Sequence, residues 1–213
     1  MHSSLTPFLP RAAALGALLA AVLLAGCATE KAPRNASYDF GPATTAAAPA
    51  PASIDAVVVT DVTGSAAFDS ERMYYRLNYA DPLQSRVYSN SRWAATPLQL
   101  VTQRLKTRFG QSGAKVLTPT DASAGIKILR LEMDDFNHSF DSVAQSYGQV
   151  TLRASLFQQH KLVDQKIFSR KISATTADAA GGARALTAAT DAIAADMVAW
   201  LASLPTAQVV PKQ

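Results

Sequence analysis

Cysteine is almost absent from this chain, which has a single one, Cys27, among 213 residues. No disulfide can therefore form within the chain, and the folded part must be held together by an ordinary apolar core. Histidine is also scarce, with three residues in all. Neither His138 nor His160 has a partner at metal-ligand spacing, so the sequence predicts no metal site and no cofactor.

Motifs of common enzyme classes are missing as well. The chain has no glycine-rich phosphate-binding loop and no Gly-x-Ser-x-Gly elbow. Glu132, Asp134 and Asp135 could act as paired carboxylates, but the solvated end of a strand is the favoured interpretation. The net charge of +4 is modest and dispersed, which argues against a nucleic-acid partner. The sequence predicts a protein that is not an enzyme.

Long apolar segments are limited to one run of 14 residues, Ala12 to Ala25, which follows Arg11. A helix needs about 20 apolar residues to cross a bilayer, so this run is typical of a secretory signal instead. Its end, Leu24-Ala25-Gly26-Cys27, resembles the lipobox of bacterial lipoproteins. We therefore expect residues 1–26 to be removed and Cys27 to be lipidated.

The residue after the cysteine indicates where the anchor goes. Ala28 stands where lipoproteins of the inner membrane typically carry aspartate. The sequence thus predicts a lipid-anchored protein on the periplasmic face of the outer membrane. With two or more acyl chains, the attachment to that membrane would be stable.

Composition divides the rest of the chain into three parts. Residues 27–53 are rich in alanine and proline and predict a disordered tether. The segment Tyr38-Asp39-Phe40-Gly41-Pro42 interrupts them, either as an apolar patch in a linker or as a segment that docks on the domain edge. We expect the folded domain over 54–204 and a C-terminal tail over 205–213.

Apolar periodicity within the domain predicts strands and two main helices. A capping box from Thr96 to Gln99 predicts a helix that begins at Pro97 and ends at Gly110. An alanine-rich apolar stripe predicts a second helix over 183–204. Strands are expected at 56–60, 73–79, 86–88, 115–117, 126–136, 147–158 and 166–174, with a turn at Asp81-Pro82. This order predicts an α+β fold, with an antiparallel-rich sheet and both helices packed on one side.

Aromatic residues and arginines gather just before the first helix. Protein interfaces are enriched in both, so Arg76, Tyr88, Arg92 and Trp93 form a hypothetical partner-binding surface. The competing interpretation is that Tyr88 and Trp93 simply close one end of the core.

These segments also carry a resemblance to a known family. Tyr38 to Pro42, Tyr75-Arg76-Leu77 and the Tyr-x-x-x-Arg-Trp-x-x-x-Pro-Leu pattern from Tyr88 to Leu98 resemble those of ABC-type transport auxiliary lipoproteins of the paraquat-inducible protein C type. The resemblance implies a periplasmic accessory of lipid transporters that contain an MCE (mammalian cell entry) domain. It also implies an MCE-domain protein as partner and association with further copies of the chain.

A second class of function also fits a lipid anchor, a long tether and a small α+β domain. An outer-membrane lipoprotein that activates a peptidoglycan synthase, or assists envelope assembly, would have the same organisation. The tether favours neither function, whereas the Tyr-Arg-Leu and Arg-Trp segments favour the transport accessory.

Overall fold

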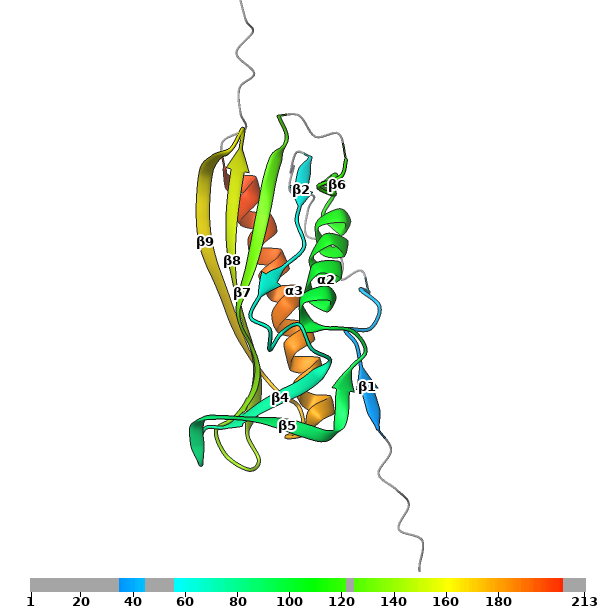
Figure 1. Cartoon of the computed structure of the whole chain (residues 1–213), viewed down its shortest axis with the longest axis vertical. Helices are drawn as coiled ribbons and strands as arrows, with labels where there is room; N and C mark the ends of the chain where they lie inside the picture. Colours follow the sequence, from blue (N-terminus) through cyan, green and yellow to red (C-terminus); the bar gives the residue numbers. More distant parts are fainter. Residues whose placement is uncertain (1–34, 45–55, 122–124, 205–213) are drawn as a thin grey trace, which may run out of the picture. The chain divides into compact units, whose positions relative to one another are not determined.

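The computed structural model describes residues 35–44, 56–121 and 125–204 of the chain (Figure 1). The predicted signal segment, the lipidation site Cys27, most of the expected tether and the tail 205–213 lie outside these residues.

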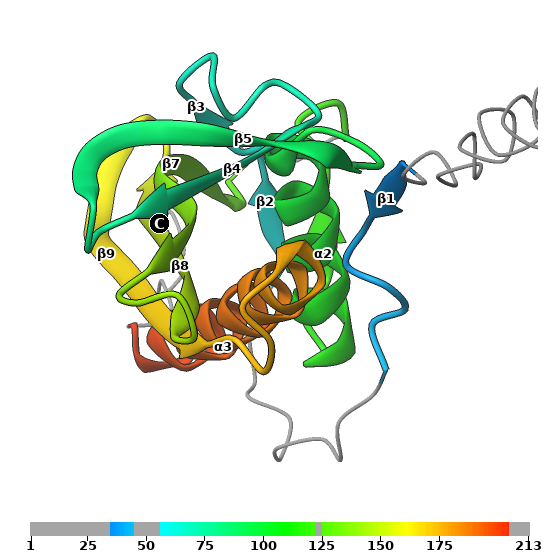
Figure 2. The same cartoon turned by 90° about the horizontal axis from the view of Figure 1, so that it is seen from below.

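Nine strands form one mixed sheet. Three long antiparallel strands, β7 (Lys127–Phe140), β8 (Ser146–Gln158) and β9 (Lys161–Ser173), make its main body. The hairpin of β4 (Arg72–Leu77) and β5 (Asp81–Trp93) crosses one end of the molecule (Figure 2). The four short strands are β1 (Ala36–Tyr38), β2 (Val57–Val59), β3 (Thr63–Gly64) and β6 (Val116–Leu117). The predicted α+β class is confirmed, with parallel pairing of β2, β3 and β4 to β7 as an additional feature.

Two helices lie side by side within the curve of the sheet (Figure 2). Helix α2 (Pro97–Gln111) begins with the predicted capping box, in which Thr96 and Gln99 bond each other's backbone N–H groups. Helix α3 (Ala179–Ser203) begins four residues earlier than expected, because the Asp178 carboxylate caps it by accepting the N–H of Gly181 at 2.7 Å. Helix α3 packs mainly on β8 and β9, and α2 packs beside α3.

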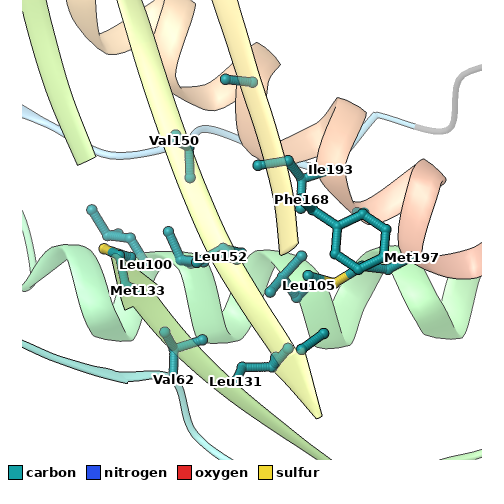
Figure 3. Close-up of a cluster of buried hydrophobic side chains, with 14 of the residues drawn as sticks. Val62, Leu100, Leu105, Leu131, Met133, Val150, Leu152, Phe168, Ile193 and Met197 are labelled. Atoms are coloured by element: carbon teal, nitrogen blue, oxygen red, sulfur yellow. The ribbon is translucent and has the colours of Figure 1, made fainter. Parts of the chain in front are cut away.

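The core lies between the two helices and the inner face of the long strands (Figure 3). Strand β8 alternates strictly, so Val150, Leu152, Ala154 and Leu156 all point inward and are fully buried. Helix α2 contributes Leu105 and helix α3 contributes Trp200, and both side chains are buried. Of the described helices, α3 is long and apolar enough to cross a membrane, but half of that stretch is buried against the sheet, as in a core helix.

A bulge in β7 reverses which of its residues face the core. Met133 pairs with Leu152 and Asp135 with Thr151, so Asp134 is left without a partner in the register. Before the bulge the inward residues have odd numbers, as in Leu129, and after it they have even numbers, as in His138. Because the extra residue keeps an apolar face inward, β7 continues four residues beyond the end predicted at Phe136.

The β4–β5 hairpin also differs from the expectation. Its turn lies at residues 78–80, where the N–H of Ala80 bonds the carbonyl of Leu77, rather than at Asp81-Pro82. Strand β5 runs for 13 residues, and the expected strand at 86–88 is only its middle. The sequence did not predict the full length of β5, because most of its residues are polar. The strand is half exposed and lacks a clean apolar alternation.

The segment 35–44 docks on the domain, which decides between the two interpretations of Tyr38–Pro42. Strand β1 pairs in parallel with the end of β5, and Phe40 is buried in the core. Its ring lies against Trp93, with the ring centres 5.9 Å apart. A tether running without interruption over 27–53 is therefore wrong for residues 35–44.

An ion cluster between the two helices fixes this docked segment. The Arg104 and Arg108 guanidinium groups on α2 each donate two hydrogen bonds, of 2.6–2.8 Å, to the Asp191 carboxylate on α3. Their remaining N–H groups donate to the carbonyls of Gly41 and Thr44. Burial works to raise the pKa of Asp191, but the hydrogen bonds from Arg108 and Arg104 outweigh it and hold that pKa below its usual value.

Candidate partner-binding surface

The four residues predicted to bind a partner all come from the β4–β5 hairpin. Arg76 lies on β4, whereas Tyr88, Arg92 and Trp93 lie on β5. The structure does not bring them into one patch, because neighbouring residues of a strand point to opposite faces.

Tyr88 belongs to an aromatic cluster beneath the hairpin. Its ring centre lies 4.5 Å from that of Tyr75, and its hydroxyl is 2.9 Å from Nδ1 of His138. Burial is the main cause that raises the pKa of the Tyr88 hydroxyl above its ordinary value. These contacts hold the Tyr88 side chain in place, so the part of its ring that stays accessible has a fixed position.

Arg76 braces the hairpin. Its guanidinium donates a 3.1 Å hydrogen bond to the carbonyl of Pro82, at the irregular point of β5 where the register with β4 shifts. The side chain is half-buried and lies away from Arg92. Arg76 therefore positions the hairpin rather than presenting a free cation.

Arg92 and Trp93 have opposite surroundings. The Arg92 side chain is 66% exposed and lies 3.8 Å from the Glu71 carboxylate, a long and weak ion pair. Trp93 is 1% exposed and packs against Phe40 and Phe136. Trp93 as a partner anchor is inconsistent with this burial, since a partner cannot reach the indole in the folded domain. The core interpretation holds for Trp93.

A groove of about 380 Å³ runs along the outer side of β5. Residues 35–36, 70–72 and 87–92 line it, so it joins Tyr88 and Arg92 with the start of β1. Glu71 and Arg72 add charge to its wall, and no sequence pattern had singled out either of them. Among the described residues, β5 pairs only with β4 between residues 82 and 90, so the groove lies beside a strand edge that no described strand pairs. An extended segment of a partner could bind such an edge through backbone hydrogen bonds.

The acidic residues of β7 show no arrangement for acid–base chemistry. The Arg153 guanidinium on β8 donates to Glu132 at 3.0 Å and to Asp134 at 3.1 Å. Asp135 instead accepts from the Gln149 amide. The three residues lie in the middle of β7, not at the solvated end of a strand that the sequence predicted, and their contacts do not fit paired catalytic carboxylates. Within the described ranges, no group of three His, Cys, Asp or Glu side chains could hold a metal ion.

His138 is the chemically unusual residue that the sequence did not single out. It is fully buried, and its Nε2 atom has no hydrogen-bond partner among the described residues. Helix α3 packs directly on the imidazole, because a Cβ atom at Gly182 would overlap it. Burial lowers the pKa of His138 from 6.5 to about 4, and the Asp178 carboxylate opposes this only in part.

This buried imidazole should make stability depend on pH. An unfolded chain binds a proton at His138 near pH 6.5, while the folded chain does not until about pH 4. The contribution of His138 is therefore fully present above pH 6.5 and falls by about 3 kcal/mol as the pH drops to 4. Urea unfolding across this pH range gives the free energy of unfolding of the wild type and of His138→Gln. The contribution of His138 is the difference between the slopes of the two free energies against pH. Parallel slopes would contradict the prediction.

Comparison with known proteins adds a family to this geometry. A family model for the ABC-type transport auxiliary lipoprotein component matches residues 38–198. No curated protein gives a significant match. A crystal structure of a DUF330-family protein from Xanthomonas campestris superposes with a TM-score of 0.60 at 17% identity, covering 81% of this chain and 88% of that one. The crystal structure of an uncharacterized protein superposes with a TM-score of 0.61 at 13% identity, covering 79% and 99%.

The two solved structures show the same fold at identities too low to carry function. The family match covers most of the described domain, from Tyr38 at the end of β1 to Val198 in α3. It thus includes the hairpin, most of the groove, all of α2 and most of α3. The chain belongs to the family of ABC-type transport auxiliary lipoprotein components.

Proposed function

We propose that this protein is a non-enzymatic, lipid-anchored subunit of an MCE-type ABC lipid-transport system, and that it docks the transporter at the periplasmic face of the outer membrane. The family match over 38–198 carries the proposal. The open groove beside β5 supports it, because it offers an unpaired edge and the exposed Arg92 to a partner. Association with further copies of the chain stays a prediction.

Lipidation of Cys27 is the first testable part. Cys27→Ala should abolish acylation, because only a thiol can form the thioether to the lipid. The folded domain should be unaffected, since the docked chain begins at Asn35. Metabolic labelling with radioactive palmitate measures the result, and label that persisted in Cys27→Ala would contradict the prediction.

Partner capture tests the transport role. The tagged full chain, solubilised from membranes, should co-purify an MCE-domain protein. Arg92→Ala should reduce this recovery without changing the fold, because the Arg92 side chain is exposed and weakly paired. Lys161→Ala, which removes an exposed cation at the β8–β9 turn, is the matched control and should leave recovery unchanged.

One result would contradict the proposal. Recovery of a penicillin-binding protein in place of an MCE-domain protein would favour the activator of peptidoglycan synthesis. Equal recovery with Arg92→Ala and the wild type would remove Arg92, though not the transport role, from the interface.

A further inference from the structure

We propose that the end of the domain formed by the β4–β5 turn and the β7–β8 loop contacts the lipid bilayer directly, with Tyr79, Leu83 and Val143 entering its interfacial region. We call these three residues the apolar tip. The inference rests on the proposed lipidation of Cys27, and it adds an orientation of the domain on the membrane.

The apolar tip consists of side chains that the domain leaves in solvent. Leu83 is 88% exposed, Val143 is 78% exposed and Tyr79 is 49% exposed. Tyr79 lies in the hairpin turn, Leu83 lies at the start of β5 and Val143 lies in the loop after β7, and these segments are at the same end of the molecule (Figure 1). Large apolar side chains exposed together mark a surface that contacts a partner or a membrane.

Hydrogen bonds hold the two loops together as one surface. The Asn78 amide donates to the Asp141 carboxylate and to the Tyr147 hydroxyl, both at 3.0 Å. Its backbone N–H donates to the carbonyl of Phe140. Together with the bond from Arg76 to Pro82, these contacts fix the backbone that carries the apolar side chains. The entropy of ordering this backbone is therefore already spent in the folded domain.

The position of Asn35, where the docked segment begins, places the apolar tip near the proposed lipid anchor on Cys27. Residues 36–44 are fixed by strand pairing, by burial of Phe40 and by the Asp191 ion cluster, so the exit at Asn35 is fixed as well. Only seven residues separate Asn35 from Cys27. Even fully extended, eight residue steps reach at most about 28 Å.

The apolar tip lies within this reach. The register of β1 with β5 places Asn35 beside Asn90, and Leu83 is seven residues from Asn90 along β5, about 23 Å away. The β8–β9 turn, by contrast, lies at the far end of the long strands (Figure 1). A lipid on Cys27 thus holds the hairpin end, and not the β8–β9 end, next to the bilayer. This is why a bilayer, rather than a protein, is the occupant that we assign.

The charges around the apolar tip agree with a bilayer that contains anionic lipid. Arg86 flanks the tip on the hairpin, where its Nε donates to the Gln84 side chain, while the two nearby acids are engaged within the domain. The Asp81 carboxylate accepts the N–H of Leu83, and Asp141 accepts from Asn78 and Lys171. Cations beside exposed apolar side chains are typical of surfaces that lie in the membrane interface.

A depth measurement on the lipidated full chain tests the proposal. Acylation consumes Cys27, the only natural cysteine, so a new cysteine can be labelled alone. The environment-sensitive dye NBD is placed by Leu83→Cys or Val143→Cys, with Lys161→Cys at the β8–β9 turn as the matched control. The labelled proteins are reconstituted in vesicles of phosphatidylethanolamine and phosphatidylglycerol, with and without a doxyl-labelled lipid quencher.

We expect the dyes at 83 and 143 to be quenched at least about twofold more than the dye at 161, because interfacial side chains enter only the outer 5–10 Å of the bilayer. Equal quenching at all three positions, in protein that floats with the vesicles, would overturn the bilayer contact and leave the anchor intact. Protein that fails to float would overturn the anchor itself, and with it both proposals. Because the dye is apolar at every position, the control at 161 accounts for insertion driven by the dye alone.

Discussion

Trp93→Ala should lower the free energy of unfolding by about 3–5 kcal/mol. The indole is 1% exposed and contacts two other rings, those of Phe40 and Phe136, with centre distances of 5.9 and 5.6 Å. Its removal leaves a cavity that the paired strands β1 and β5 cannot close without losing their register. Urea unfolding followed by circular dichroism measures the loss.

The neighbouring residue supplies the control for Trp93. Arg92→Ala removes an exposed side chain and should change stability by less than about 0.5 kcal/mol. Measuring the affinity for the captured partner on both variants separates stability from binding. A Trp93→Ala protein with the wild-type unfolding midpoint and a weakened partner complex would contradict the core assignment and restore Trp93 as an interface anchor.

Asp191→Ala should lower the free energy of unfolding by about 3 kcal/mol, because it leaves two arginines of α2 without their counter-ion. The Arg104 side chain is 7% exposed and cannot turn into solvent while α2 and α3 remain packed. Asp191 itself is 24% exposed, which places the loss at the lower end of the range for buried pairs. The loss should also loosen residues 41–44, whose carbonyls the same arginines bind. Hydrogen exchange in that segment would report it.

A second aspartate on the same helix provides a matched control. Asp196 pairs with Arg170 at the surface, where the two side chains are 34% and 47% exposed. Asp196→Ala should therefore cost less than about 1 kcal/mol. Equal losses for the two variants would show that the Asp191 cluster is no stronger than a surface ion pair.

The sequence predicted best where the determining interactions are local. The start of α2 depends on Thr96, Pro97 and Gln99, which lie within one turn, and the structure shows the expected capping box. Strand β8 was predicted equally well, because buried and half-buried residues alternate without a break between Ser146 and Leu156. The family resemblance followed from motifs in the hairpin, and the match over 38–198 confirms it.

The sequence predicted strands β7 and β5 less well, because the register of each strand shifts. One extra residue, Asp134, reverses the inward face of β7, so a period-two pattern read from Leu129 ends too early. The same reversal points the His138 side chain into the core, and no local sequence pattern predicts this burial. In β5 the shift opposite Arg76 and Leu77 moves the turn to residues 78–80.

The sequence by itself predicted an anchoring signal, and it determined the α+β class and the capped helix, because each depends on residues close together in the chain. Only the tertiary structure decided that Trp93 is core, that Arg104 is buried and that residues 35–44 belong to the domain. Those outcomes depend on partners far away in sequence, such as Phe40, Asp191 and β5, whose approach no local spacing encodes. Because that segment is docked, only seven residues separate Cys27 from the described domain, which is the basis of the proposed contact between the apolar tip and the membrane.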